Sequence, residues 1–351
     1  MTGSETSHRA ACAGPGEVVE CCRDLLPRAV SSHPAFDDVL AYLHGLDADI
    51  SSFCFYIEWN LREGGIDLTF TFPTTLAGSV RLRFWDLARS LVGPAPGEAK
   101  RGRALLEGVC RRLRTLPLEA PLFPRAVSIS LGPIGGTEGG GVDLVFLDFG
   151  PVLDLGSDPG QLRRAFELLE PPGPLPRQEE PLDVLERVAA GLELAHVGAG
   201  WRRGSPLHKA YLRGRLDELV GAVVDRGAAP LIGSHLRDLE RLASDAGRHT
   251  AHLVLDAAGG SLARVGFELN FDLAGAEGFA RLAAADALWL DAVNGELRRD
   301  AERLLELGSV GRPLDDGAHA RLRVSHLKLS FDGSGRPEWK AYLCFQRSLA
   351  G

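Results

Sequence analysis

Residues 53–60 (FCFYIEWN) alternate strictly between apolar and polar or small side chains, and residues 66–72 (IDLTFTF) repeat the alternation. A period of two is typical of a β-strand that buries one face. The two runs are joined by a short polar segment with two adjacent glycines, which marks a hairpin turn. This part of the chain therefore predicts an antiparallel hairpin with one apolar and one polar face.

Four further pairs of alternating runs follow at similar intervals, each pair interrupted by glycine or charged turn residues. They span residues 126–149, 193–213, 249–271 and 321–346. Amphipathic, helix-like stretches lie between the pairs, at 35–46, 98–115, 180–192, 214–226, 275–287 and 293–308. The order of elements predicts an α+β fold in which an αββ unit is repeated five times.

A short internal match supports the repeat. Residues 206–212 read PLHKAYL in the third hairpin, and residues 337–343 read PEWKAYL at the same place in the fifth. The chain has only four lysines, and two of them, Lys209 and Lys340, fall in this matched context. Self-similarity of this kind indicates a repeat architecture. We expect a partly helical N-terminal segment over residues 1–30, followed by one repeat-built domain over 31–351.

The alternation leaves two architectures open. The helices need an apolar surface and should cover the apolar faces of the strands, so the polar faces either meet water in an open one-layer sheet or line a closed barrel. Closure is favoured because those faces carry Tyr, His, Lys, Arg and Glu, and because it removes unpaired strand edges. The prediction is a closed antiparallel ten-stranded β-barrel ringed by helices.

One strand departs from the period. In the fifth hairpin Arg321, Arg323 and Ser325 share a face, whereas the polar positions after them shift to His326 and Lys328. A β-bulge inserts one extra residue into a strand and so restores the facing of the residues beyond it. We therefore expect a bulge at Ser325 and His326.

Composition narrows the class of protein. The 351 residues are 45% hydrophobic and carry a formal net charge of −8, which argues against nucleic acid or an anionic membrane surface as a partner. The six cysteines contain no CxxC pair. The N-terminus lacks a signal-peptide pattern, and no stretch approaches the roughly 18 apolar residues of a membrane span. We expect a cytoplasmic protein that binds a small molecule or a peptide.

Candidate chemistry lies on the polar faces of the second strands. Side chains two residues apart share a face, which groups Lys209 with Tyr211, Lys340 with Tyr342, and Arg264 with Glu268 and Asn270. Cations beside phenol hydroxyls suit a phosphate or diphosphate, and the aromatic rings shield a nearby carbocation. Lys328 is expected in the same anion site. Tyr56 is expected to contact a substrate other than the phosphate or diphosphate, and Glu58 to act as an acid or base. No His or Cys spacing matches a metal site.

These features resemble the ABBA-type aromatic prenyltransferases, and the indole prenyltransferase branch above all. The KAYL strands look like that family's recurring Lys-x-Tyr, which binds the prenyl diphosphate. The segment Ile57-Glu58-Trp59-Asn60 is similar to the strand whose glutamate contacts the aromatic substrate and accepts its proton. Ala263-Arg264-Val265 is similar to the family's Arg-x-Lys-x-Tyr strand.

The resemblance implies an aromatic prenyltransferase of natural-product (secondary) metabolism. It would transfer a prenyl group from an allylic diphosphate to an electron-rich ring of a small molecule or a peptide side chain. Glu58 would be catalytic, and Lys209, Tyr211, Arg264, Lys328, Lys340 and Tyr342 would bind the diphosphate, with Glu268, Asn270 and Tyr56 binding the acceptor. No cofactor is expected to be required; Mg²⁺ can assist without being essential, because the sequence has no DDxxD cluster.

The sequence also departs from the family pattern. Gly266 and Glu268 stand where the pattern has Lys and Tyr, and the second hairpin has Asp143 and no cation. These departures keep a second hypothesis open, a non-catalytic protein of a natural-product pathway that binds a peptide or hydrophobic ligand in the same lumen. A lyase or cyclase acting on a prenylated product is a third.

Structural roles also remain open for the candidate residues themselves. The Lys-Ala-Tyr-Leu strands could be solvated sheet surface, Glu58 could pair with Arg62 at a rim, and Arg264 with Glu268 could be a same-strand ion pair.

Overall fold

A computed structural model of the 351-residue chain describes most of its residues. The described residues are 12–61, 66–74, 98–132, 142–170, 179–202, 205–246, 250–258, 260–270, 299, 309–334 and 337–349.

The strands form one closed barrel. In the described ranges, ten strands pair antiparallel in the order β1-β2-β3-β4-β5-β6-β7-β8-β10-β11, and β11 closes the ring by pairing with β1 as well as β10. They are β1 (Phe55–Asn60), β2 (Ile66–Pro73), β3 (Ala126–Leu131), β4 (Val142–Asp154), β5 (Glu193–Arg202), β6 (Ser205–Arg215), β7 (Thr250–Ala258), β8 (Ser261–Asn270), β10 (Ala318–Phe331) and β11 (Glu338–Leu349). The predicted ten-stranded antiparallel barrel is confirmed, and its strands form the five predicted hairpins.

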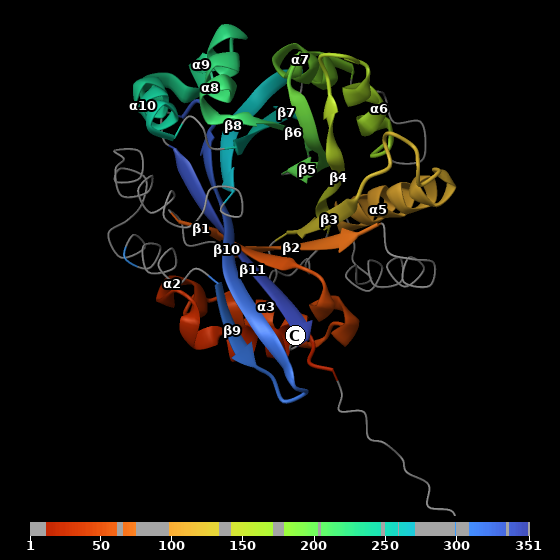
Figure 1. The fold of residues 1–351 in the computed structure, drawn as a ribbon, viewed down its shortest axis with the longest axis vertical. Coiled ribbons are helices and arrows are strands. Elements are labelled where there is room, and N and C mark those ends of the chain that lie inside the picture. Colours follow the sequence, from red (N-terminus) through yellow and green to blue (C-terminus); the bar gives the residue numbers. More distant parts are fainter. Residues whose placement is uncertain are drawn as a thin grey trace, which may run out of the picture.

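The last hairpin, β10–β11, extends beyond the strands that pair with it in the barrel. The C-terminal half of β10 pairs with β8, whereas its N-terminal half, over 319–323, pairs with an extra strand, β9 (Ser309–Pro313), which the alternation did not predict. Figure 1 shows β9, β10 and β11 running on below the ring of strands. The helix α1 (Pro15–Cys21) packs against this extension.

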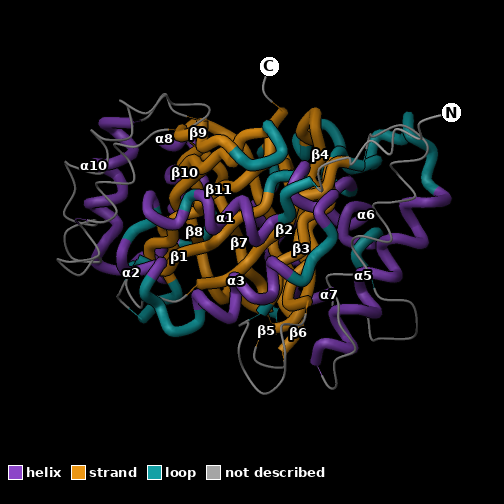
Figure 2. Tube along the Cα trace, turned by 90° about the horizontal axis from the view of Figure 1, so that it is seen from below, coloured by secondary structure: helices purple, strands orange, loops and turns teal. Residues whose placement is uncertain are grey.

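Helices surround the strands, as Figure 2 shows. Besides α1 they are α2 (Arg28–Ser31), α3 (Phe36–His44), α5 (Glu98–Thr115), α6 (Gln161–Glu167), α7 (Glu179–Ala189), α8 (Leu216–Asp225), α9 (Ala229–Ile232) and α10 (Leu236–Ala246). Short 3₁₀ turns lie at η1 (Arg23–Leu25), η2 (Ala48–Ser52) and η3 (Gly233–His235). The helices predicted at 35–46, 98–115, 180–192 and 214–226 are confirmed within a few residues. Those predicted at 275–287 and 293–308 lie outside the described residues, apart from residue 299.

The core lies between strands and helices, on the outer face of the barrel. Phe55, Ile57 and Trp59 are fully buried, while the side chains between them face the lumen. Phe55 stacks between Phe70 and Phe345 from the two neighbouring strands, with ring centroids 5.8 and 5.5 Å away. Apolar burial against the helices therefore fixes which face of each strand turns inward.

Two local features show how individual residues determine the fold, and the first was predicted from the sequence. The β10–β11 register shifts between Val324 and His326, so the bulge expected at Ser325 is present and turns His326 and Lys328 to the polar face. A Cβ on Gly102 of α5 would stand 1.9 Å from the carbonyl oxygen of Val142, so only glycine permits this close packing of helix on strand. None of the described helices combines the length and hydropathy needed to cross a membrane.

Candidate active site in the barrel lumen

The polar faces of the strands enclose a cavity of about 780 Å³. Side chains from all ten barrel strands line it. Nine of the ten residues that the sequence singled out are among them: Tyr56, Glu58, Lys209, Tyr211, Arg264, Glu268, Lys328, Lys340 and Tyr342. The tenth, Asn270, ends β8 and pairs through its backbone with His326, but its side chain lies outside the described part of the chain.

Glu58 lies on β1 between a hydroxyl and an ammonium group. Thr69 Oγ1 donates a 2.5 Å hydrogen bond to Glu58 Oε1, and Lys340 Nζ stands 3.7 Å from Oε2. Burial acts to raise the pKa of Glu58, but the charge of Lys340 and the bond from Thr69 outweigh it and hold that pKa below its usual value. Glu58 is thus a buried but ionised carboxylate, ready to accept a proton.

Lys340 on β11 is shared between two carboxylates. Its Nζ lies 3.3 Å from Asp67 Oδ2 as well as 3.7 Å from Glu58. Burial lowers the pKa of Lys340, but Glu58 and Asp67 more than offset that effect and raise it. This lysine stays charged beside the candidate base.

Two more cations stand on the strands β6 and β8. Lys209 Nζ lies 3.3 Å from Asp256 Oδ2, and Arg264 Nη1 lies 2.5 Å from Glu338 Oε2. Burial, with the nearby positive charges, lowers the pKa of Lys209 to about 8 despite Asp256. Two buried atoms, Arg264 Nε on β8 and Asp256 Oδ1 on β7, have no hydrogen-bond partner among the described residues. Each can therefore form a hydrogen bond with a ligand.

Lys328 enters the lumen from β10, next to Gly266 of β8. It is 5% exposed, and its Nζ lies 5.2 Å from the centre of the Tyr211 ring and 3.7 Å from Glu268. A Cβ on Gly266 would stand 3.2 Å from Lys328 Cε, so the missing side chain leaves room for the lysine. The neighbouring strand therefore places a second cation beside Arg264 of β8 in the lumen.

The tyrosines form an aromatic lining around these charges. His326 lies flat on Tyr342, with ring centroids 3.9 Å apart, and tilts against Tyr56 at 6.2 Å. Tyr211 meets Phe146 edge to face at 5.8 Å. Burial raises the pKa of Tyr211 and Tyr342 well above the usual value, so both hydroxyls stay protonated and can donate hydrogen bonds.

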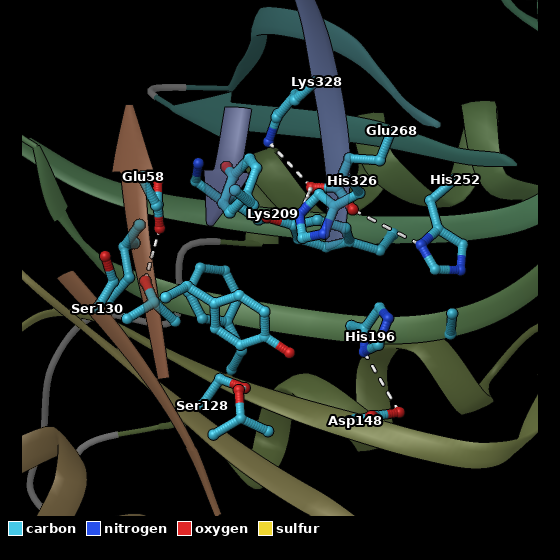
Figure 3. Close-up of a pocket in the computed structure, with 18 of the residues that line it drawn as sticks. Glu58, Ser128, Ser130, Asp148, His196, Lys209, His252, Glu268, His326 and Lys328 are labelled. Carbon is cyan, nitrogen blue, oxygen red and sulfur yellow. Dashed lines mark hydrogen bonds and ion pairs between the residues drawn. The ribbon is translucent and has the colours of Figure 1, made fainter. Parts of the chain in front are cut away.

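Sequence reasoning did not assign four further lining residues to the site: Asp148, His196, His252 and His326. His252 Nδ1 lies 3.6 Å from Glu268 Oε2, and His196 Nδ1 lies 3.3 Å from Asp148 Oδ1 (Figure 3). A signal was present, because the pairing of Arg202 with Ser205 sets the hairpin register and places His196 directly opposite Tyr211. The bulge likewise brings His326 opposite Tyr342.

The alternatives of a solvated sheet surface and of a same-strand ion pair do not match this geometry. Lys209, Tyr211, Lys340 and Tyr342 face the lumen. Arg264 pairs with Glu338 on another strand, and Glu268 is contacted by Lys328 and two histidines. Arg62, the proposed rim partner of Glu58, lies outside the described residues.

Asp and Glu side chains line the described cavity in the same number as Lys and Arg side chains, and three histidines lie among them. Each of the four central cations has a carboxylate within 4 Å. Within the described ranges no cluster of three or more His, Cys, Asp or Glu side chains is arranged to hold a metal ion. None of the six cysteines, all of which lie in the described ranges, forms a disulfide.

A closed ten-stranded antiparallel barrel ringed by helices is the fold of the ABBA-type aromatic prenyltransferases. Comparison with solved structures gives this result at low sequence identity. The structure resembles 5-dimethylallyltryptophan synthase from Streptomyces coelicolor, at 15% identity over 94% of each chain with a TM-score of 0.53.

Two further structures resemble it to the same degree. The prenyltransferase PriB, solved with L-tryptophan and dimethylallyl thiolodiphosphate, is 15% identical over 96% of this chain and 98% of its own, with a TM-score of 0.54. NotF, solved with brevianamide F and the same kind of donor analogue, is 12% identical over 99% and 98%, with a TM-score of 0.55. No protein-family model matches the sequence, and a search of curated proteins found no match.

Proposed function

We propose that this protein transfers a prenyl group from an allylic diphosphate to an electron-rich aromatic ring, as a cytoplasmic enzyme of natural-product biosynthesis. One observation carries the proposal: Lys209, Arg264, Lys328 and Lys340, from four different strands, converge on a single cavity that also holds the ionised Glu58. Fold similarity alone does not decide function. The solved relatives PriB and NotF add that donor analogues of this class occupy such barrels.

The diphosphate would lie among the four cations. Its oxygens carry more charge than the carboxylates that contact those cations, and the unpartnered Arg264 Nε offers a further donor. Ionisation breaks the bond between the prenyl carbon and the diphosphate oxygen, and the electron pair leaves with the diphosphate. Tyr211 and Tyr342 would screen the allylic cation with their ring faces and donate from their hydroxyls.

Glu58 would then complete the reaction. The aromatic ring attacks the cation, a carbon–carbon bond forms, and the proton on the attacked ring carbon passes to the Glu58 carboxylate. Tyr56 and Glu268 would contact the acceptor. No metal ion is required in this scheme, and Mg²⁺ can assist by accompanying the diphosphate.

The test is incubation with dimethylallyl, geranyl and farnesyl diphosphates and a panel of indoles, phenols and aromatic peptides, with products detected by mass. Lys209→Gln and Lys340→Gln are expected to weaken binding of dimethylallyl thiolodiphosphate. Arg103→Gln removes an exposed cation on α5 and is the matched control. If the protein binds no allylic diphosphate or thiolodiphosphate, the proposal is wrong.

The carboxylate beside every central cation favours a second candidate, a non-catalytic protein that binds a peptide or hydrophobic ligand in the same lumen. Tight peptide binding that is unchanged in Lys340→Ala and Glu58→Gln would support this candidate. Loss of binding in those variants, together with prenyl transfer by the wild type, would exclude it.

A further inference from the structure

Asp148 and His196 form a carboxylate–imidazole pair on the wall of the lumen away from Glu58. They stand directly opposite each other on β4 and β5, and His196 Nδ1 lies 3.3 Å from Asp148 Oδ1. A carboxylate at Nδ1 fixes the tautomer and orientation of an imidazole and leaves proton exchange to Nε2. Both side chains line the cavity, and neither takes part in the donor site described above.

Aromatic and charged groups enclose the His196 ring. Tyr211 on β6 and His252 on β7 contact it edge to face, with ring centroids 5.5 and 5.1 Å away. Glu268 on β8 lies behind His252, and Arg125 is the cation that faces Asp148. Figure 3 shows His196 between Asp148 and His252, with Glu58 on the other side of the chamber.

The topology keeps the two acid–base groups apart. Three strands separate β1 from β5 in one direction around the barrel, and five separate them in the other. Glu58 and His196 therefore approach the lumen from opposing walls, and an aromatic ring bound in the lumen can lie between them. A cavity of about 780 Å³ is large enough for such a ring together with a short prenyl chain.

We propose that Asp148 and His196 form a second acid–base pair that accepts the hydroxyl proton of a phenolic acceptor, while Glu58 accepts the proton from its ring carbon. This inference rests on the proposed transferase function and specifies its substrate class. An indole alkylated at carbon has no hydroxyl to lose and needs only Glu58. A phenol gains from both groups, because removing the O–H proton raises the electron density of the ring.

The proton and electron balance closes without a further reactant. The phenol O–H proton moves to His196 Nε2 as the ring attacks, the new carbon–carbon bond forms, and the diphosphate leaves with the electrons of the broken C–O bond. Glu58 takes the ring proton, and His196 returns its proton to the product oxygen. One proton and one diphosphate are released for each prenylated phenol.

The electrostatics of the pair agree with this role. Burial lowers the pKa of His196, but the Asp148 carboxylate outweighs burial and raises it above the usual value. For His252 burial prevails over Glu268, and the pKa is lowered. Of these two neighbouring imidazoles, His196 is thus the stronger base toward a bound phenol.

The first experiment uses 4-nitrophenol, whose ionised form absorbs visible light, and needs no prenyl donor. At a slightly acidic pH where the free probe is mostly neutral, we expect the wild-type protein to bind it as the phenolate, and His196→Gln to abolish that absorbance. His208 lies one strand away on β6, against Phe166 of α6 and outside the lumen lining. His208→Gln is therefore the control, and it should leave the phenolate absorbance unchanged.

The second experiment measures prenyl transfer to a phenol and to an indole in separate assays, each with the same allylic diphosphate. His196→Gln and Asp148→Asn are expected to lower kcat with a phenol about a hundredfold, the usual contribution of a general acid–base group. The same variants should lower kcat with an indole far less than with a phenol and should remove the histidine limb from the phenol pH profile.

Three results would overturn the proposal: no phenolate absorbance in the wild type, the same absorbance in His196→Gln, or an equal loss of phenol and indole transfer in a folded variant. The proposed transferase function fails separately. If the phenolate absorbance depends on His196 but no allylic diphosphate reacts, the phenol site stands and the transferase does not.

Discussion

Lys328 and Gly266 share one space in the lumen: a Cβ built on Gly266 would stand 3.2 Å from Lys328 Cε, 3.0 Å from Ser330 Oγ and 3.1 Å from the backbone oxygen of Leu329. The absence of a side chain at Gly266 of β8 thus makes room for Lys328 of the neighbouring strand β10. The position of the Lys328 ammonium group is therefore coupled to the residue at position 266.

Gly266→Ala should therefore disturb both packing and donor binding. The new methyl group forces β10 and Lys328 to move by a few tenths of an ångström, and we expect a loss of about 1–3 kcal/mol in the free energy of unfolding. Dimethylallyl thiolodiphosphate should also bind more weakly, as measured by calorimetry.

Gly221→Ala is the matched control, because nothing lies within 4 Å of a Cβ there. It should raise stability by about 0.5–1 kcal/mol, as helical Gly→Ala replacements do. Unaltered donor affinity in folded Gly266→Ala would contradict the coupling.

Binding of the donor should depend on pH through Lys209. Its pKa is lowered to about 8, chiefly by burial, so the side chain is charged below that pH and loses its charge as the pH rises through it. Affinity for inorganic diphosphate should fall between about pH 7 and pH 9 for this reason. Lys209→Arg keeps its positive charge throughout this pH range. The ionisation of the diphosphate itself is the same in titrations of either protein. Calorimetric titrations of the two proteins should diverge above pH 8. Parallel curves would remove Lys209 from the anion site.

The alternation of residues predicted the barrel because each strand has one side that must be buried. In β1, the fully buried Ile57 and Trp59 pack outward, and this alone turns Glu58 into the lumen. The bulge was predictable for the same reason, since Lys328 and Arg323 cannot share a face without an extra residue between them. Period-two burial acts locally and is therefore visible in one sequence.

Ion-pair partners were not predictable, because they depend on strand order across the barrel. Arg264 pairs with Glu338, 74 residues away, rather than with Glu268 on its own strand. The Asp148–His196 contact depends on the pairing of the second hairpin with the third. The strand β9 was missed because its five residues show no clear alternation and pair only with the extension of β10.

Glu268 should make the fold sensitive to acid. Burial would raise the pKa of its carboxyl, but His326, His252 and Lys328 outweigh burial and lower it well below the unfolded value. A carboxylate with a lowered folded pKa stabilises the fold above its unfolded pKa, near 4.3, and the stabilisation is lost as the pH falls toward the folded pKa. Glu268→Gln should flatten this part of the curve of unfolding free energy against pH, as followed by urea denaturation.

The same substitution leaves a buried cation without its carboxylate. Near neutral pH we expect Glu268→Gln to cost about 3 kcal/mol, with part of the loss recovered in the double variant Glu268→Gln/Lys328→Met. Asp217→Asn breaks an exposed pair with Arg215 and should change the curve little. If the acid limb keeps its wild-type slope in Glu268→Gln, the stabilising role assigned to this carboxylate is wrong.

Glu58→Gln should separate ionisation of the donor from transfer. The amide keeps the size of the side chain and can still bond to Thr69, but it cannot accept the ring proton. We expect prenyl transfer to an indole to fall about a hundredfold or more. The allylic cation should still form and be captured by water, so the ratio of prenyl alcohol to prenylated product should rise, as quantified by chromatography.

Asp67→Asn is the matched control for that experiment, because Asp67 lies 3.3 Å from the same Lys340 but does not bond to Thr69. Both substitutions remove a negative charge beside Lys340, and only Glu58→Gln removes the carboxylate assigned as the base. Asp67→Asn should therefore retain most of the transfer and a low ratio of alcohol to product. Equal losses in the two variants would mean that Glu58 acts only through the charge of Lys340, and the ring proton would then need another acceptor.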